Sequence, residues 1–227
     1  GELIGYIQFQ PMETKDKYNQ TILFCTVNKE GNEHKIVFVD TLKNPHIGNN
    51  VYFSFSWSLN GKSIAWVRSF SQGYAEIILR ELDSGKERIL TNDQKSINDI
   101  AFISNDEILF STDRDGNPNL WCVSISTKTM TQITRGVMPI YNIDISSIAK
   151  KIVLSQQQNN SDIWIANIDG SNVRKFAPIE RFCFSPSFSP DGKKIALVMS
   201  DVNPFSVYND QIYIIDGNRL ERKQLTN

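Results

Sequence analysis

Residues 188–196 read Phe-Ser-Pro-Asp-Gly-Lys-Lys-Ile-Ala, and this stretch decides the fold. Its Asp-Gly pair is typical of a tight turn between two strands, because glycine adopts φ > 0 without a Cβ clash. A near-complete copy, Trp-Ser-Leu-Asn-Gly-Lys, occupies residues 57–62, and eroded copies begin at Phe102 and Ile145. The copies start 45, 43 and 43 residues apart, which indicates an internal repeat.

Two further markers keep the same period. Apolar runs at residues 76–79, 119–122, 162–165 and 211–214 follow one another at intervals of 43, 43 and 49 residues. Short segments at 89–91, 132–134, 175–177 and 224–226, three of which end in threonine, show the same three intervals. The six extra residues fall between Ser200 and Asp210. Three markers with one period establish the repeat.

Each copy is rich in short apolar and aromatic runs bounded by Gly, Asn, Asp and Ser, and none holds a helical apolar stripe. The last copy predicts strands at 184–188, 195–199, 211–215 and 222–225, and a weaker leading copy predicts strands at 3–9, 21–24 and 35–38. Four strands in about 40–45 residues make one propeller blade. The sequence therefore predicts an all-β propeller of four-stranded blades, about five of them visible. We expect one domain, 1–227, with blades at 1–50, 51–93, 94–136, 137–178 and 179–227.

Apolar residues make up 40% of the chain, and 24 Lys and Arg are balanced by 25 Asp and Glu, for a net charge of −1. Because there is no basic excess, general binding of nucleic acid or of an anionic membrane surface is disfavoured. No apolar run approaches the roughly 20 residues that cross a bilayer, so no membrane insertion is predicted. Cys25, Cys122 and Cys183 stand far apart in apolar stretches, which predicts buried thiols. Trp57, Trp66, Trp121 and Trp164 lie on predicted strands, where we expect them to pack between blades.

The motif at 188–196, followed by Gln-Ile-Tyr-Ile at 211–214 and Gln-Leu-Thr at 224–226, resembles the TolB-like, WD-related β-propeller repeat. The resemblance covers residues 53–227 well and 1–52 weakly. It implies a propeller that is often six-bladed, so either five blades form the ring or a further blade lies outside this chain. Members of the family occur as a periplasmic partner of the peptidoglycan-associated lipoprotein, as lids on prolyl-oligopeptidase-type enzymes and as sensor ends of signalling proteins. The resemblance thus favours a periplasmic or otherwise extracytoplasmic location.

The sequence does not contain the residue patterns that catalysis requires. No G-x-S-x-G occurs, and the only histidines, His34 and His46, fall in the weak first copy and its trailing loop, where surface roles are expected. Residues 61–63, Gly-Lys-Ser, imitate a phosphate-binding loop, but its first glycine is replaced by Ser56 and a strand follows. No pair of acids recurs on the predicted innermost strands, which disfavours a glycosidase or lyase. We expect no enzymatic activity, no cofactor and no catalytic metal.

A weak calcium candidate lies at residues 113–117. Asp113, Asp115 and Asn117 offer oxygen ligands at alternate positions, as a calcium-binding loop does. The rest of such a loop, with its closing glutamate, is absent, and Gly116 suits a simple turn. A turn is therefore favoured over a metal site.

Longer, irregular segments gather at one predicted end of the propeller. Because neighbouring strands are antiparallel, loops between second and third strands share one end with the connections between blades. The residues at this end that suit an interface are Arg68, Phe70, Tyr74, Arg114, Arg135, Met138, Tyr141, Arg181, Phe205 and Tyr208. We expect them to surround one mouth of the central channel and to bind a protein or peptide. The alternative is inward packing over the blade ends, first of all for Tyr141, which is predicted to lie just before a strand.

The leading functional prediction is a non-catalytic scaffold that binds a protein or peptide partner at this mouth, as an envelope-associated or sensor module. The alternative is the substrate-gating propeller of a prolyl-oligopeptidase-like serine hydrolase whose catalytic domain is absent from this chain. A sequence continuation with G-x-S-x-G would select the hydrolase, and one with a kinase or membrane-spanning segment would select the sensor.

Overall fold

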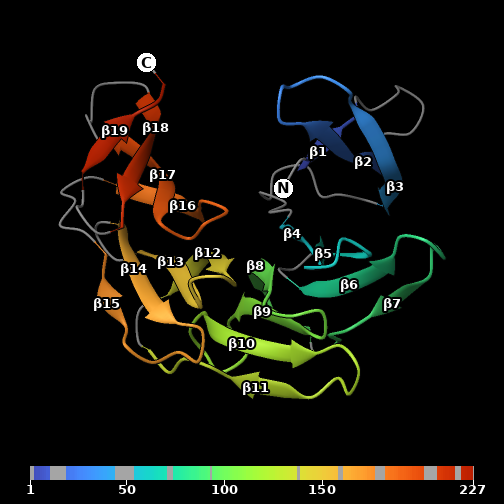
Figure 1. The fold of residues 1–227 in the computed structure, drawn as a ribbon. Coiled ribbons are helices and arrows are strands. Elements are labelled where there is room, and N and C mark those ends of the chain that lie inside the picture. Colours follow the sequence, from blue (N-terminus) through green and yellow to red (C-terminus); the bar gives the residue numbers. More distant parts are fainter. Residues whose placement is uncertain are drawn as a thin grey trace. The chain divides into compact units, whose positions relative to one another are not determined.

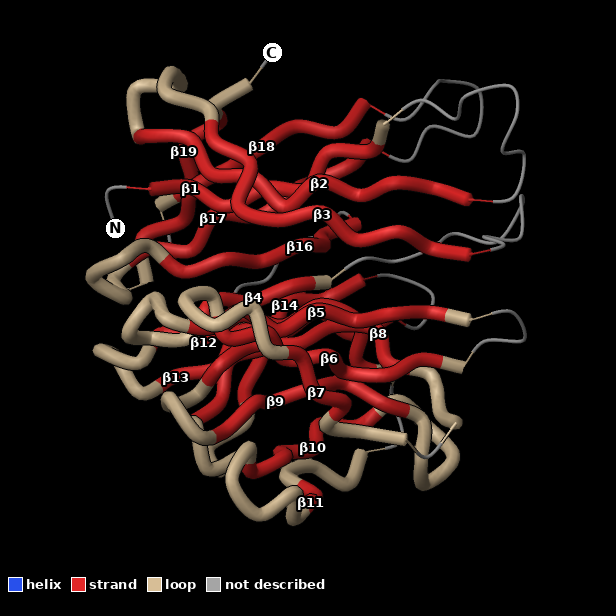
Figure 2. The backbone as a smooth tube through the Cα atoms, turned by 90° about the vertical axis from the view of Figure 1, so that its right-hand side faces the viewer, coloured by secondary structure: helices blue, strands red, loops and turns tan. Residues whose placement is uncertain are grey.

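The computed structural model of the chain describes residues 3–10, 19–43, 54–70, 74–92, 94–136, 139–157, 161–176, 182–201, 209–217 and 221–226. These residues form strands, turns and loops without a helix (Figure 2). A membrane-spanning helix is accordingly not found in these ranges. The chain divides into two compact units: unit 1 contains Gly1–Val51 and Phe70–Gln72, and unit 2 contains Tyr52–Ser69 and Gly73–Asn227.

Unit 1 holds one antiparallel sheet in the order β1-β2-β3, formed by β1 (Leu3–Phe9), β2 (Asn19–Asn28) and β3 (Lys35–Lys43). The rings of Phe24 and Phe38 stack at 4.2 Å between centroids, across the paired strands β2 and β3. This sheet confirms the weak leading copy of the repeat, with three strands in the described residues.

Unit 2 contains four sheets of four strands each, and each sheet follows the order of the chain. The first is β4 (Phe55–Trp57), β5 (Ser63–Ser69), β6 (Ala75–Glu81) and β7 (Glu87–Ile89), and the second is β8 (Ile97–Phe102), β9 (Glu107–Thr112), β10 (Asn119–Ser124) and β11 (Met130–Gln132). The third is β12 (Ile140–Ser146), β13 (Lys151–Gln157), β14 (Ser161–Asn167) and β15 (Arg174–Lys175), and the fourth is β16 (Phe182–Phe188), β17 (Lys194–Asp201), β18 (Asn209–Asp216) and β19 (Arg222–Gln224).

The four sheets stack face to face as propeller blades. Their first strands, β4, β8, β12 and β16, contact one another in sequence and lie on the inside of unit 2 (Figure 1). Apolar clusters fill the space between consecutive sheets: one includes Ile77 of β6 and Phe110 of β9, and another includes Ile163 of β14 and Leu197 of β17. A single sheet cannot cover both of its apolar faces, so each blade needs its neighbours. The all-β propeller prediction is confirmed, whereas the grouping of all 227 residues into one domain stays a prediction.

The decisive motif forms the turn between the first two strands of a blade. Ser189 accepts a hydrogen bond from the Lys194 backbone N–H at 2.9 Å, and Asp191 accepts one from the Lys193 N–H at 3.1 Å. Donation from nearby hydroxyl and backbone groups, first of all the Ser189 hydroxyl, lowers the pKa of Asp191. Gly192 completes the turn at φ 69°. The motif is therefore a turn whose side chains bond to its own backbone, as predicted.

The Leu-Thr marker also has a structural cause. The Thr91 hydroxyl accepts a 2.9 Å hydrogen bond from the Ile77 backbone N–H, and Thr134 and Thr226 accept equivalent bonds from Leu120 and Ile212 at 2.9 Å. Each threonine thus continues the pairing of the fourth strand with the third beyond the regular backbone ladder.

Replacing Thr91 with valine is expected to lower the free energy of unfolding by about 1–3 kcal/mol, because the buried Ile77 N–H loses its acceptor while shape is kept. Chemical denaturation followed by tryptophan fluorescence measures this, since all four tryptophans lie in unit 2. Thr131→Val, at an exposed position of β11, is the control and should change stability by less than about 0.5 kcal/mol. Equal effects of the two substitutions would contradict the role assigned to the Thr91 hydroxyl.

Candidate functional site

Loops and blade connections meet at one end of unit 2, as the sequence predicted. The Ala75 N–H donates to the Lys95 carbonyl at 3.0 Å, and the Ile140 N–H donates to the Pro118 carbonyl at 3.0 Å. Both bonds join a loop between second and third strands to a connection between blades. We call this the loop end, formed by the described residues of 74, 94–96, 113–118 and 133–139. The opposite end, with the turns at 58–62, 103–106, 146–150, 168–173 and 189–193, is called the turn end.

Six of the ten residues predicted to bind a partner lie in the described part of the chain. Met138, Arg181, Phe205 and Tyr208 lie outside the described residues, and their roles stay predictions. Tyr74 and Arg135 are exposed at the loop end of unit 2, and Tyr141 is 38% exposed on β12. Phe70 is also exposed but belongs to unit 1.

Arg68 and Arg114 lie against aromatic rings of their own blades. The guanidinium carbon of Arg114 is 4.9 Å from the centroid of Trp121 and 5.5 Å from that of Phe110. Arg68 lies 5.8 Å from the Trp66 ring and 4.0 Å from a Glu87 carboxylate oxygen. Stacking of this kind contributes about 0.5–2 kcal/mol and orients the guanidinium group. These two arginines stabilise the blade edges in addition to any contact with a partner.

The sequence predicts that Tyr141 binds a partner, with inward packing as the alternative because the residue is expected just before a strand. It lies inside β12, where the pairing with β13 shifts between Ile140 and Ile143. A bulge turns one side chain out of the regular alternation, and here the exposed side chain is Tyr141. This exposure disagrees with the inward-packing alternative, and a role of Tyr141 in binding a partner stays a prediction.

The carboxylates of the weak calcium candidate bind different protein donors. Asp113 accepts a hydrogen bond from the Ser96 backbone N–H at 3.0 Å, and Asp115 accepts one from the Gln132 side chain. The Gly116 N–H donates to the Asp113 carbonyl at 2.9 Å, which makes the segment a turn at the loop end. Asn119, the first residue of β10, donates through its side-chain amide to the Asn117 carbonyl at 3.3 Å. No group of three His, Cys, Asp or Glu suited to a metal ion occurs among the described residues.

A half-buried carboxylate on β8 connects the residue before β4 with β12. Asp99, on β8, accepts hydrogen bonds from the Ser54 hydroxyl, from its neighbour Ile100 N–H at 2.9 Å and from the Ile143 N–H of β12 at 2.7 Å. Burial raises the pKa of Asp99 to about 6, against the lowering effect of these donors. Hydrogen bonds thus stabilise the charged form of the Asp99 carboxylate, whereas desolvation destabilises it.

Asp144 continues this arrangement to the next blade. On β12, its carboxylate accepts hydrogen bonds from the Ser187 hydroxyl at 3.0 Å and from the Phe188 N–H at 2.5 Å, at the end of β16. Burial raises its pKa as well. Acids therefore do occur on two inner strands, but they do not recur at one repeat position, and both carboxylates accept hydrogen bonds from neighbouring blades.

Sequence comparison between copies misses these two acids because they do not align. When the copies are aligned on the first residue of the motif, Phe102 or Ile145, Asp144 aligns with Ala101. In the same alignment, Asp99 aligns with Asn142. Bulges shift the pairing of β8 with β9 and of β12 with β13. The two carboxylates differ by two positions when the copies are aligned, yet each reaches the blade that follows its own. The sequence signal that could have found them is an acid within an otherwise apolar strand.

Residues considered for catalysis are engaged elsewhere or are not described. His34 lies in unit 1, where its Nδ1 is 2.9 Å from the Tyr6 hydroxyl, and His46 lies outside the described residues. Cys25, Cys122 and Cys183 are buried free thiols, as predicted, and burial raises the pKa of Cys122 to about 11. A thiol that stays protonated at neutral pH is a poor nucleophile.

The stacked four-stranded sheets define this chain as a β-propeller repeat protein. It belongs to the family of the dipeptidyl peptidase IV N-terminal region, whose sequence model matches residues 12–163. The predicted TolB-like character is also confirmed, since the chain is 27% identical over 141 residues to the Tol-Pal system protein TolB of Anaeromyxobacter dehalogenans (strain 2CP-C). That alignment covers 60% of this chain and 32% of the relative, so this chain spans about a third of the length of the curated protein.

Solved structures agree on the fold. TolB from Acinetobacter baumannii superposes with a TM-score of 0.71 at 22% identity, over 100% of this chain and 54% of that protein. A puromycin-hydrolysing peptidase of Mycobacterium tuberculosis superposes with a TM-score of 0.69 at 8% identity, over 100% of this chain and 36% of the peptidase. At these identities the likeness concerns the propeller fold alone.

Proposed function

We propose that this chain is a propeller scaffold without a catalytic site of its own, which binds a protein or peptide partner at the loop end. One observation carries the proposal: bonds between loops and blade connections hold this end in place, while Tyr74 and Arg135 at this end and Tyr141 at the adjoining start of β12 stay exposed. Preorganised aromatic and arginine side chains lose little conformational entropy on binding, and both types are enriched at interface hot spots.

The relatives support a location and a type of partner. Their name, Tol-Pal system protein, places TolB in a system of several proteins, which agrees with a protein partner here. By this likeness we place the chain outside the cytoplasm, as an envelope-associated or sensor module. Phe205 and Tyr208 remain proposed members of the same surface.

A second candidate function has its own support. The match to the dipeptidyl peptidase IV N-terminal region favours a propeller that controls access to a hydrolase. In that case the occupant of one propeller end is a catalytic domain, and peptide substrates reach it through the propeller. A G-x-S-x-G motif in the continuation of the gene would favour this second function.

Site-specific photocrosslinking tests the proposed function. A benzoylphenylalanine at position 74 or 141, in the chain as it is made in its own cells, is expected to form a covalent adduct with a discrete protein or peptide. The same group at Leu59 or Ile148, exposed at the turn end, should not form that adduct. Equal crosslinking from both ends, or from the turn end alone, would overturn the proposed surface.

Substitutions at and next to the loop end should weaken binding of the partner without unfolding the chain. Arg135→Gln combined with Tyr141→Ser is expected to reduce affinity for the crosslinked partner at least tenfold, equivalent to about 1.4 kcal/mol. Both side chains are exposed, so the free energy of unfolding should change by less than about 0.5 kcal/mol. Titration of the purified proteins measures the first and denaturant unfolding the second; a large loss of stability would mean that these residues support the fold instead.

A further inference from the structure

A pocket of about 320 Å³ opens at the turn end of unit 2, away from the surface discussed above. The described residues that line it come from one blade: Lys151 of β13, Ile165 and Ala166 of β14, Asn172 of the following turn and Arg174 of β15. The strand register places Ile165 opposite both Val153 and Arg174, and Lys151 two positions before Val153. Lys151, Ile165 and Arg174 therefore share one face of the sheet, the face on which Ile165 packs against the β16–β19 blade.

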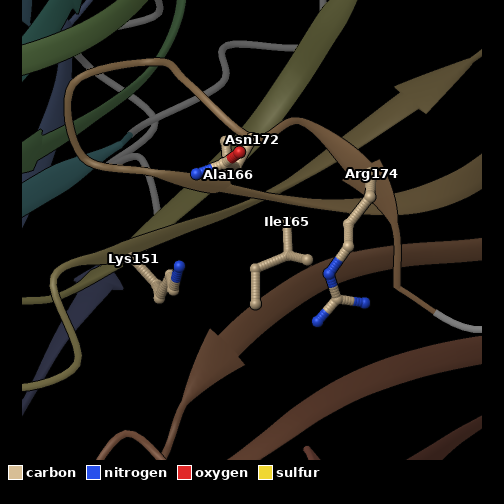
Figure 3. A pocket seen from close by; sticks show the side chains of 5 residues that line it. All are labelled: Lys151, Ile165, Ala166, Asn172 and Arg174. Carbon is tan, nitrogen blue, oxygen red and sulfur yellow. The ribbon is translucent and has the colours of Figure 1, made fainter.

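Two cations flank an apolar floor in this pocket. Figure 3 shows Lys151 on one side of Ile165 and Arg174 on the other, with Ala166 and Asn172 above Ile165 in this view. The Lys151 ammonium donates to the Asn167 side-chain oxygen, which leaves two further N–H donors. Arg174 is exposed and has no hydrogen-bond or ion-pair partner among the described residues. Its five N–H donors are arranged to bind a carboxylate or phosphate in bidentate fashion.

The acids near this pocket are bound to other donors. The described residues that line it include no carboxylate. Asp144 lies on the same face of the sheet, opposite Val153, but its carboxylate accepts hydrogen bonds from Ser187 and Phe188 of the next blade. The nearest acid in the same turn, Asp169, accepts hydrogen bonds from the Ser171 N–H at 2.9 Å and from the Ser171 hydroxyl at 2.6 Å. These bonds, with a smaller contribution from the Lys151 charge, lower the pKa of Asp169. Asp169 is thus bound within its own turn and does not form an ion pair with Arg174.

We propose that this pocket binds a small organic dianion, with one oxyanion group at Lys151, the other at Arg174 and the apolar middle of the ligand over Ile165. Two separated cations select two separated anionic groups, and Ile165 favours an aliphatic link over a hydrated one. The site is independent of the loop end, so a partner bound there and a dianion bound here would not compete.

Calorimetric titration with glutarate, a short dicarboxylate, tests the site at constant ionic strength. The wild-type chain is expected to bind glutarate and to bind butyrate, which carries one carboxylate, at least tenfold more weakly. Arg174→Gln and Lys151→Gln should each weaken glutarate binding by about 10- to 100-fold, the loss of one charge-assisted contact. Absence of saturable glutarate binding at roughly millimolar concentration would overturn the proposal.

Lys175→Gln is the matched control. Lys175 is the neighbour of Arg174 on β15 and carries the same charge, but it lies on the other face, where its ammonium pairs with Asp162 at 2.7 Å. Its substitution should leave glutarate affinity within about twofold of the wild type. Equal weakening by Lys175→Gln and Arg174→Gln would show a general charge effect and overturn the pocket, as would butyrate binding as tightly as glutarate. Unchanged denaturation curves verify that the variants are folded.

Discussion

Gly192→Ala is expected to lower the free energy of unfolding of unit 2 by about 3 kcal/mol. A Cβ at this position would clash with the Ser146 hydroxyl and come within 2.7 Å of the Ala149 Cβ. Neither neighbour moves easily: Ser146 is buried and accepts a hydrogen bond from the Ala149 N–H at 3.1 Å. The φ of 69° adds backbone strain for any L-residue.

Gly61→Ala separates the two causes. Gly61 occupies the same turn position in the β4–β7 blade, with φ 67°, but a Cβ there would meet nothing within 4 Å. Its substitution should destabilise by about 1 kcal/mol, from the backbone conformation alone. Denaturant unfolding followed by tryptophan fluorescence compares the two variants. If they lost the same stability, the close approach of the turn at Gly192 to the turn at Ala149 would have no energetic role.

Stability of unit 2 is expected to rise as the pH falls from 7.5 to 5, because of Asp99. Its folded-state pKa of about 6 lies above the ordinary value of 3.8, so folding favours the protonated form. The resulting contribution to stability is complete below about pH 4 and is lost as the pH rises through 6. From pH 5 to pH 7.5 the loss amounts to about 1.5 kcal/mol, and the full range corresponds to about 3 kcal/mol.

Asp99→Asn should remove this contribution at all pH values. The asparagine amide must place its NH₂ group against a backbone or hydroxyl donor, so the variant is also expected to be less stable at pH 5 by about 1–3 kcal/mol. Asp169→Asn is the control: Asp169 is exposed and its pKa is lowered, so its titration lies below this pH range and the wild-type slope should persist. Parallel pH profiles for the wild type and Asp99→Asn would refute the assignment.

The repeat markers and the blades show how far sequence reasoning reaches. The predicted strands at 195–199 and 211–215 fall inside β17 and β18, and the predicted turn at Gly192 is present. These features are local: alternating apolar residues and a residue with φ > 0 act through contacts within a few residues, and a repeat supplies several copies of the evidence. The separation of loop end and turn end followed from antiparallel pairing alone.

The acids on the inner strands and the pocket are features that the sequence did not predict. Asp99 lies next to Ile143 only because two blades stack, and the bulges that align them leave no mark in the repeat spacing. Lys151 and Arg174 are 23 positions apart in the sequence and are brought together across β14. Tyr141 is exposed because the pairing of β12 with β13 shifts at this point, and the residue type alone does not predict this exposure.

The amino-acid sequence by itself determined that this chain forms four-stranded blades, where each turn falls and which segments share an end. Those properties depend on side-chain alternation and turn chemistry, which operate between near neighbours. Only the tertiary structure decided which charges are buried, which aromatic groups stay exposed and where two cations face a common cavity. These properties depend on the desolvation and register of blades packed against each other, so they exist only once distant copies of the repeat are in contact.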